Sequence, residues 1–478
     1  MHALDLTVIG VYIVAMLGIG VYFMRRNTDA EDYYLAGRGM GSWHIGLSVV
    51  ATDVGGGFSI GLGGLGFMMG IAGSWMLFTG LVGAWTSAVL LIPRVRRLGA
   101  EHRFFTLPHF FGHYYGARVA YLAGVISAIG YLGFTASQVL AGAKLASASF
   151  QGLDHTTALL VMGGIVVVYT VMGGLTAVIH TDTIQWIVLM VGLCFVGIPV
   201  AYLGIGGLEA IRTTLPDGFL SLGNVSWTRL VNWSVTIIPI WYVGMTLYQR
   251  IYASRSEADA KRAWFVAGLF EWPVMAFMGV LLGLMARVAA DQGMFAALGF
   301  HDVAALDAEM GLPLLLRQVL PVGLKGLMVA AYFSAIMSTA DSCLMASSGN
   351  VATDLLDPLL PFDADSPKAV RLSQGVTLVL GIAALVLAAS MQNVLQLMLH
   401  SYAFMVSGLF VPVIGVLTGH HGSRAGAFGS MLLGGVTTST LAALEGMKLL
   451  QLPLGLDANI FGIAVSAAVF ALFGRRAP

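Results

Sequence analysis

Residues 334–348 read SAIMSTADSCLMASS, and apolar sequence surrounds this stretch on both sides. Its hydroxyl groups and its aspartate therefore lie inside what reads as a membrane span. Ala335, Ser338, Thr339 and Ser342 recur at helical spacing, so we expect them to share one helix face. Hydroxyl oxygens are suitable ligands for a hard cation. Serine and threonine also join membrane helices at small-residue interfaces, which is the alternative interpretation.

The composition of the whole chain indicates a membrane protein. Of its 478 residues, 58% are hydrophobic and 10% are charged, whereas soluble proteins carry about 25% charged residues. The lipid bilayer is therefore the expected environment, and we expect a multi-pass protein of the cell membrane, in a bacterium the cytoplasmic membrane. The chain has no basic run that would indicate nucleic-acid binding.

Thirteen segments are long and apolar enough to be predicted as membrane-spanning helices. A helix needs about 20 apolar residues to cross the hydrocarbon. Closed barrels would show short alternating segments instead, so we predict an all-α protein. The predicted spans are 5–24, 44–67, 74–92, 119–147, 157–172, 178–203, 231–249, 264–286, 322–347, 370–389, 393–417, 425–443 and 459–474.

The distribution of basic residues predicts the orientation. Lysine and arginine accumulate on cytoplasmic loops. With the N-terminus outside, most of the 24 lysines and arginines lie on inside loops, Arg250 included. An outside N-terminus and a cytoplasmic C-terminus also require an odd number of spans, in agreement with thirteen.

Two of the predicted spans carry residues that interrupt helices. Gly55, Gly56 and Gly57 lie in the second span, and Pro239 lies at a comparable depth in the seventh. Each of these spans opens a set of five. Paired interruptions are typical of inverted-repeat transporters with a site at the bilayer midplane. Membrane helices also carry glycine and proline routinely, so these paired interruptions alone do not establish an inverted repeat.

Acidic residues inside the predicted spans need a partner. Asp53, Asp182, Asp341 and Glu271 all fall within apolar segments. A charged side chain at the bilayer centre costs about 2.5–3.5 kcal/mol on insertion scales. A buried carboxylate without a partner must bind a cation or take up a proton, and both outcomes serve ion coupling.

Three motifs show a resemblance to a known family. MSTADSCLMASS (337–348) followed by ATDLL, MGGLTAVIHTDTIQ (172–185) and ATDVGGGFSIG (51–61) stand in the family's order. The chain resembles the sodium:solute symporters, with proline-type, pantothenate-type, choline-type and sialic acid-type carriers among them. The resemblance implies a LeuT-like 5+5 inverted repeat with discontinuous helices. It divides the chain into an extra N-terminal helix (1–30), a first repeat (42–203), a second repeat (229–419) and two C-terminal helices (424–478).

The resemblance also implies residues for two sodium sites. The family's main site combines carbonyls of the first core helix with hydroxyls of the eighth, here Ala51, Val54, Ala335, Ser338 and Thr339. Some members hold a second sodium, and the corresponding residues are Asp182, Ser338, Asp341 and Ser342. The two carboxylates of this second set leave open whether it holds a sodium or shares a proton.

The expected solute is an amino acid or a carboxylate-like molecule. An ammonium group suits aromatic rings with one carboxylate, and a loose glycine run offers N–H groups to a carboxylate. Each aromatic ring is individually more often a packing residue than a ligand. The candidate solute-binding residues are Asp53, Gly56, Phe58, Tyr131, Gln138, Trp241 and Tyr242, with His400 and Tyr402 as further candidates.

We therefore predict a carrier that imports this solute together with sodium by alternating access. No metalloprotease motif or nucleophile–base pair with convincing spacing is present, so we do not expect an enzyme. The expected partners are sodium, the solute and the lipid bilayer; we expect neither an organic cofactor nor a nucleic acid, and an oligomer is not required. A proton-coupled carrier of the same fold and a non-transporting membrane receptor are the alternatives.

Overall fold

The protein is helical throughout the described part of the chain, which in this computed structural model comprises residues 2–25, 35, 39–53, 55–150, 152–357 and 367–473. No strand occurs in these ranges, where one isolated bridge pairs Met40 with Ser254. Ten helical segments of this part are long and apolar enough to cross a membrane, and two shorter apolar helices lie near its two ends. The chain is therefore a multi-pass, all-helical membrane protein.

The first half of the described chain consists mainly of α-helices and ends with α9, α10 and α11. Its helices are α1 (Ala3–Met24), α3 (Ser42–Asp53), α4 (Gly56–Met69), α5 (Trp75–Leu90), α6 (Ile92–Glu101), α7 (Leu107–Tyr115), α8 (Ala117–Ser149), α9 (His155–Met190), α10 (Ile198–Gly204) and α11 (Gly207–Thr214). A 3-10 turn (Gly70–Ser74) precedes α5, and a π-helical segment (Val191–Gly197) joins α9 to α10.

The second half has the same helical character. Its helices are α12 (Trp227–Val243), α13 (Met245–Ala253), α14 (Glu257–Leu269), α15 (Ala276–Asp291), α16 (Ala308–Val319), α17 (Leu324–Gly349), α18 (Pro367–Ala389), α19 (Val394–Leu417), α20 (Arg424–Gly446) and α21 (Ala458–Phe473). π-Helical segments separate α14 from α15 (Phe270–Met275) and follow α17 (Asn350–Leu356). Short 3-10 turns occupy Ala296–Leu298 and Pro453–Gly455.

The glycine run divides the second predicted span into two helices. The helix α3 ends at Asp53, and α4 begins at Gly56. Gly55 between them adopts an extended conformation. A Cβ atom at Gly55 would lie 1.7 Å from Thr339 Oγ1. Only a glycine at position 55 therefore allows α17 to approach the break this closely. The sequence prediction of an interruption here is confirmed.

The interruption of the seventh predicted span lies elsewhere than predicted. Pro239 is contained within α12, and the chain leaves the helix at Gly244, five residues later. Tyr131 of α8 stabilises this break, because its hydroxyl accepts a hydrogen bond from Thr246 N (3.3 Å) in the first turn of α13. That amide has no partner within its own helix. The break therefore follows a tertiary contact rather than the proline.

The helix α9 changes direction along its length. Tyr169 Oη and Thr181 Oγ1 lie 2.7 Å apart although twelve positions separate them. Twelve residues of straight α-helix span about 18 Å. The chain therefore bends sharply between these residues, where the predicted spans 157–172 and 178–203 meet.

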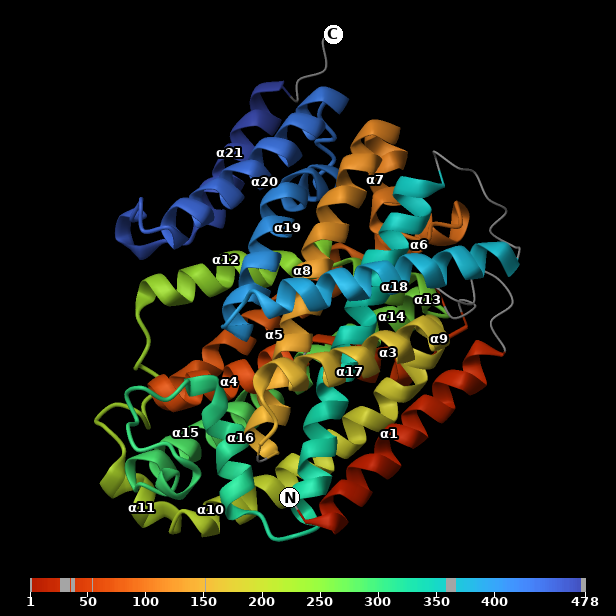
Figure 1. The fold of residues 1–478 in the computed structure, drawn as a ribbon. Coiled ribbons are helices and arrows are strands. Elements are labelled where there is room, and N and C mark those ends of the chain that lie inside the picture. The colour runs from red at the N-terminus through yellow and green to blue at the C-terminus, as the bar shows by residue number, and fades with distance from the viewer. Residues whose placement is uncertain are drawn as a thin grey trace.

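The helix α17 forms the centre of the molecule. It packs against α1, α3, α8 and α9, and nearly all of its side chains are buried. Figure 1 shows α17 crossed by α18 and flanked by α1, while α20 and α21 lie together at one edge of the bundle. Peripheral helices instead expose valines such as Val14, Val379 and Val386. The polar sequence of α17 is thus at the core, and apolar side chains face outward as lipid requires.

Candidate functional site

The break between α3 and α4 lies directly against the hydroxyl-rich face of α17. Thr339 Oγ1 donates a hydrogen bond to the carbonyl of Ala51 (3.1 Å) in the last turn of α3. Ala335 and Ser338 are buried on the same helix as Thr339. Four of the five residues predicted for the main sodium site are therefore in this part of the fold. The fifth, Val54, lies outside the described residues.

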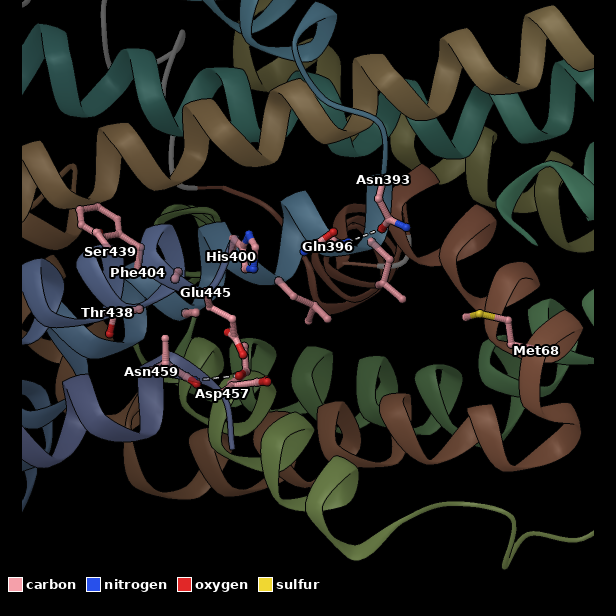
Figure 2. A pocket seen from close by; sticks show the side chains of 16 residues that line it. Met68, Asn393, Gln396, His400, Phe404, Thr438, Ser439, Glu445, Asp457 and Asn459 are labelled. Atoms are coloured by element: carbon pink, nitrogen blue, oxygen red, sulfur yellow. Dashed lines mark hydrogen bonds between the residues drawn. The ribbon is translucent and has the colours of Figure 1, made fainter. Parts of the chain in front are cut away.

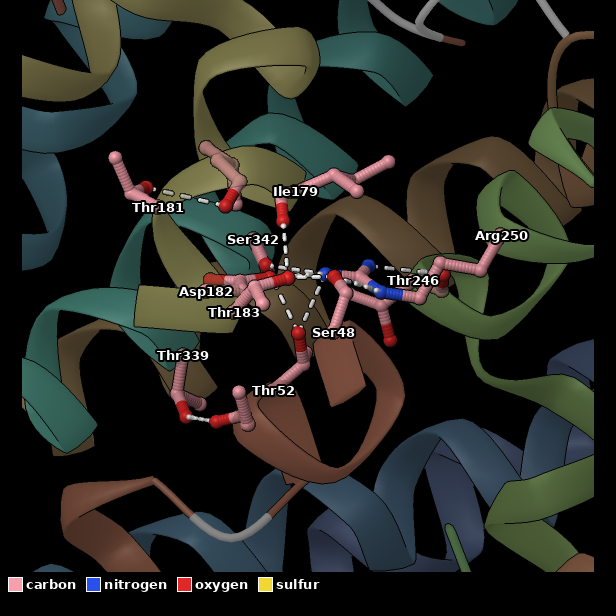
Figure 3. A network of polar contacts seen from close by, with 12 residues as sticks. Ser48, Thr52, Ile179, Thr181, Asp182, Thr183, Thr246, Arg250, Thr339 and Ser342 are labelled. Carbon is pink, nitrogen blue, oxygen red and sulfur yellow. Dashed lines mark hydrogen bonds and ion pairs between the residues drawn. The ribbon is translucent and has the colours of Figure 1, made fainter. Parts of the chain in front are cut away.

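A fully buried arginine dominates the neighbouring polar network (Figure 3). Arg250 Nη2 lies 3.2 Å from Asp182 Oδ2, and its Nε donates to Ser48 Oγ (3.0 Å). The same Nη2 donates to Thr52 Oγ1 (2.5 Å) and to Ser342 Oγ (2.7 Å). We call these five residues the arginine cluster. It joins α3, α9, α13 and α17 at one point, so all four helices share one set of polar contacts.

The short contacts within the arginine cluster concentrate on one oxygen of Asp182. Besides the guanidinium, Oδ2 accepts a hydrogen bond from Ser48 Oγ (2.5 Å). The other oxygen, Oδ1, has no hydrogen-bond partner among the described residues, and neither has Ser338 Oγ, which lies next to Asp182. Two buried oxygens from different helices are therefore open to a ligand at the side of the cluster that faces the main predicted site.

Asp341 adds a second carboxylate to the same region of α17. Its Oδ1 accepts a hydrogen bond from Thr170 (2.6 Å) in α9, while Oδ2 has no partner within the described ranges. It forms no ion pair there with a lysine or arginine. Two carboxylates and one guanidinium carry a net charge of −2 + 1 = −1 when all are ionised. A bound cation or a proton is the physical means of balancing this buried charge.

Some of the predicted solute-binding residues come together beside the broken helices. Gln138 Oε1 would lie 3.2 Å from a Cβ atom at Gly56, so the amide of Gln138 faces the start of α4. Tyr131 contacts the start of α13 through Thr246 Oγ1 (3.0 Å). The side chains of Asp53 and Phe58 are outside the described structure, although their backbones border the break.

The predicted tryptophan and its neighbour have other surroundings. Trp241 is fully buried, its ring lies against Gly83 of α5, and it meets Trp264 of α14 edge-on at 6.3 Å. Tyr242 meets the ring of Phe410 in α19 at 5.8 Å. Trp241 thus packs toward α5 and α14, away from the residues that gather at the α3–α4 break.

A cavity of about 480 Å³ opens between α12, α19, α20 and α21 (Figure 2). Glu445, Asp457 and His400 line it, and so does Asn459, whose buried Oδ1 has no partner within the described ranges. An adjoining cavity of about 420 Å³ shares Asn393 and Leu395 with it and continues toward α16. We call the first cavity the vestibule. Its polar lining is rich in hydrogen-bond acceptors and formal negative charge.

Comparison with known proteins identifies the family. The model of the sodium:solute symporter family matches residues 33–434. The chain belongs to the sodium:solute symporter family. The osmoregulated proline transporter OpuE of Bacillus subtilis (strain 168) is 27% identical over 442 residues, which cover 90% of this chain and 87% of that transporter. The sodium/proline symporter of Escherichia coli (strain K12) is 28% identical over 484 residues, covering 97% and 92% of the two chains.

A solved structure supports the same architecture. The substrate-bound outward-open state of a Na⁺-coupled sialic acid symporter matches with a TM-score of 0.78 at 21% sequence identity, covering 100% of this chain and 99% of that one. The fold of this symporter is therefore that of a sodium-coupled transporter of known structure. The protein is a sodium-coupled solute symporter and not an enzyme, as the sequence predicted.

Arg250 is the residue that sequence reasoning misplaced. We assigned it to an inside loop because it follows the apolar span 231–249, but the symporter buries its side chain completely. The sequence holds one signal of this: Thr246 and Gln249 already bring polar groups into the end of that span. Ser48 and Thr52 were also missed as partners of Asp182, since nothing local distinguishes them from helix-packing hydroxyls.

Proposed function

We propose that this symporter imports a small zwitterionic solute, such as an amino acid, coupled to inward sodium flow by alternating access. One observation carries the proposal: a buried region with net negative charge and unpartnered oxygens borders the break between α3 and α4. Sodium at that break would bind differently as the helices rearrange, and such a difference in affinity is what couples an ion to a conformational change.

The proposed main sodium site consists of Ala51, Val54, Ala335, Ser338 and Thr339. The contact between Thr339 and the Ala51 carbonyl supports it, because both oxygens already face each other across the two helices (3.1 Å). Sodium would take over the Ala51 carbonyl and the Thr339 hydroxyl. Ser338 Oγ, which is buried and has no hydrogen-bond partner among the described residues, would become a further ligand.

A second sodium at Asp182, Ser338, Asp341 and Ser342 would compete with Arg250. The guanidinium contacts both Asp182 Oδ2 and Ser342 Oγ, so two of the proposed ligands already have a cation beside them. We propose that a second sodium binds there only after Arg250 moves away. A Hill coefficient near one for sodium in wild-type uptake would match this competition, and a coefficient near two would contradict it.

The vestibule supports an ammonium group on the solute. Glu445 and Asp457 contribute negative charge, and Asn459 contributes a buried carbonyl oxygen without a partner in the described structure. These groups attract a cation or an ammonium and repel a dicarboxylate. The relatives named as proline transporters are consistent with a zwitterion, with Gln138 and Asp53 proposed to hold the solute at the α3–α4 break. Gly56, Phe58, Tyr131, Trp241 and Tyr242 complete the proposed solute set.

The proposed architecture is a LeuT-like 5+5 inverted repeat of thirteen spans. The breaks at the end of α3 and at Gly244 lie in the first span of each of the two proposed repeats, 42–203 and 229–419. The N-terminus is proposed to lie outside and the C-terminus inside. One sodium crossing about 100 mV releases roughly 2.3 kcal/mol, and a tenfold gradient adds about 1.4 kcal/mol, enough for a few-hundredfold accumulation.

Uptake by purified protein in proteoliposomes tests the proposal. A thermal-shift screen of amino acids, carboxylates and sugars, each with and without sodium, first selects the solute. Its uptake should then require an inward sodium gradient. A proton-coupled carrier is the second candidate, favoured by the two carboxylates Asp182 and Asp341. Uptake driven by a pH jump and indifferent to sodium would overturn the sodium assignment in favour of that candidate.

A further inference from the structure

A groove with two arginines lies where α8 and α20 begin, far along the chain from the ion site. It encloses about 610 Å³ and includes Arg118, the second residue of α8, and Arg424, the first residue of α20. No acidic residue lines this groove. Both arginines are exposed, and neither forms an ion pair with any residue that the structure describes. The groove therefore holds two cationic groups without a protein counter-charge.

The backbone adds to the positive character of the groove. Gly116, which precedes α8, has φ +87° and offers no side chain to cap the helix. The absence of a Cβ atom lets the Arg424 guanidinium lie over this position, since an added Cβ would stand 3.7 Å from its Cζ. The first two N–H groups of α8 and of α20 have no acceptor within their own helices, and a helix N-terminus carries partial positive charge. Ser423 caps the next amide of α20 by accepting a hydrogen bond from Gly426 N (2.9 Å). The two helix starts thus reinforce the field of the two arginines.

Below the arginines the groove is apolar. Val119 and Tyr115 are buried in its floor, and Phe428 is 37% exposed in its wall. Along α20, Leu432 and Val436 follow Phe428 at intervals of four and are also exposed, so they form one apolar stripe on the helix surface. The stripe runs from the arginines toward the middle of the span. A ligand that fits this arrangement has an anionic head and a long apolar tail.

We propose that this groove is a binding site for an anionic phospholipid. Its phosphate lies between Arg118 and Arg424, and an acyl chain follows Phe428, Leu432 and Val436. Basic pockets between membrane helices recognise anionic headgroups in this way, and guanidinium groups pair well with phosphate. Such a lipid would bridge α8 to the peripheral pair of α20 and α21, which packs at the edge of the bundle (Figure 1).

The experiment uses full-length symporter purified in detergent and stripped of lipid. Thermal unfolding midpoints are measured with added phosphatidylglycerol, phosphatidylcholine or inorganic phosphate. Native mass spectrometry counts the retained phosphatidylglycerol. The groove variant is Arg118→Gln with Arg424→Gln. The matched control is Arg97→Gln with Arg262→Gln, which removes the same charge from two exposed arginines on α6 and α14.

Phosphatidylglycerol should raise the midpoint of the wild type by several degrees, because a ligand that binds the folded state stabilises it, while phosphatidylcholine should not. The groove variant should lose at least half of this shift and one retained lipid, and the control variant should lose neither. An equal loss in both variants would overturn the proposal by showing a general charge effect. Full retention by the groove variant, or an equal shift with inorganic phosphate, would overturn it as well.

Discussion

Two clusters of charged groups in this symporter have the same formal charge but different surroundings; the first is fully buried, whereas the second includes the 41% exposed side chain of Asp307. In the arginine cluster and the adjacent Asp341, two carboxylates face one guanidinium. In a second group, which we call the lysine cluster, Lys144 Nζ lies 2.6 Å from both Asp307 Oδ2 and Glu309 Oε2. Each group therefore sums to −1, and what differs is how the remaining charge is compensated.

The lysine cluster uses all of its carboxylate oxygens. Glu309 Oε2 and Oε1 accept hydrogen bonds from Val394 N (3.0 Å) and Leu395 N (2.9 Å) at the start of α19. Asp307 Oδ1 accepts one from Glu309 N (3.0 Å). A helix N-terminus stabilises negative charge. Each carboxylate oxygen of this group therefore has a partner within the protein. The group links α8 and the start of α16 to the first turn of α19.

The region around the arginine cluster, in contrast, has buried oxygens that accept no hydrogen bond from the described residues. Asp182 Oδ1, Asp341 Oδ2 and Ser338 Oγ have no partners within the described ranges. The difference teaches that buried charge by itself does not indicate a binding site. Unused acceptors combined with uncompensated charge are the better indication, and the region beside the α3–α4 break has both.

Removing the lysine should have the largest effect on stability. Lys144→Met leaves two carboxylates near α19 without their cation, and breaking a buried ion pair costs about 3–5 kcal/mol. We expect a large fall in the thermal unfolding midpoint, with sodium affinity of the surviving folded protein unchanged. Lys325→Met, in the first turn of α17, serves as the control. If Lys144→Met had the same unfolding midpoint as the control variant, the lysine cluster would not stabilise the folded state.

Removing both hydroxyls of the proposed main site should have the next largest effect. Ser338→Ala with Thr339→Ala should lower the apparent sodium affinity at least 100-fold, about 2.7 kcal/mol, because two sodium ligands are lost. Sodium-dependent thermal shift and uptake measure this. Ser347→Ala on the same helix, which removes a hydroxyl bonded to the Ala128 carbonyl, should retain the wild-type sodium affinity. If sodium affinity survives in the double variant, the ion site lies elsewhere.

The two aspartates should respond in opposite ways to neutralisation. Asp341→Asn removes an unpaired charge and keeps an acceptor for Thr170, so we expect the unfolding midpoint to change by less than about 2 °C while ion coupling weakens. Asp182→Asn leaves Arg250 without its counter-charge but keeps an oxygen that accepts from its guanidinium, so it should destabilise by about 1–3 kcal/mol, less than the loss of the whole Lys144 side chain. Equal midpoints for the two variants would remove the distinction between paired and unpaired carboxylates on which the comparison depends.

The smallest expected effect is a pH dependence in the vestibule. Burial, and then the nearby Glu445, raise the pKa of Asp457 above its usual value. As the pH falls through that raised pKa, Asp457 takes up a proton and attracts an ammonium group less. The KM for the solute should rise roughly twofold to threefold between about pH 7 and pH 5. Asp457→Asn should have a raised KM already at neutral pH and lose most of this dependence; an unchanged pH profile would exclude Asp457 as its source.

The sequence by itself determined that the chain is a helical membrane protein, which helices carry polar groups, and to which family the motifs belong. Those properties depend on local composition and spacing, because the apolar bilayer acts on each span separately. Two residues of the proposed main sodium site could be singled out in the same way, since Ser338 and Thr339 stand out within an apolar helix.

Only the tertiary structure decided which buried charged groups have a partner of opposite charge or a hydrogen-bond donor beside them. Whether Arg250 lies in a loop or in the core depends on the break at Gly244, which turns α13 toward α3, α9 and α17. Likewise, Lys144 meets Glu309 across 165 positions of the chain. Charges interact through space and at short range, so the partner that completes one carboxylate and leaves another open cannot be found from neighbouring residues in the sequence.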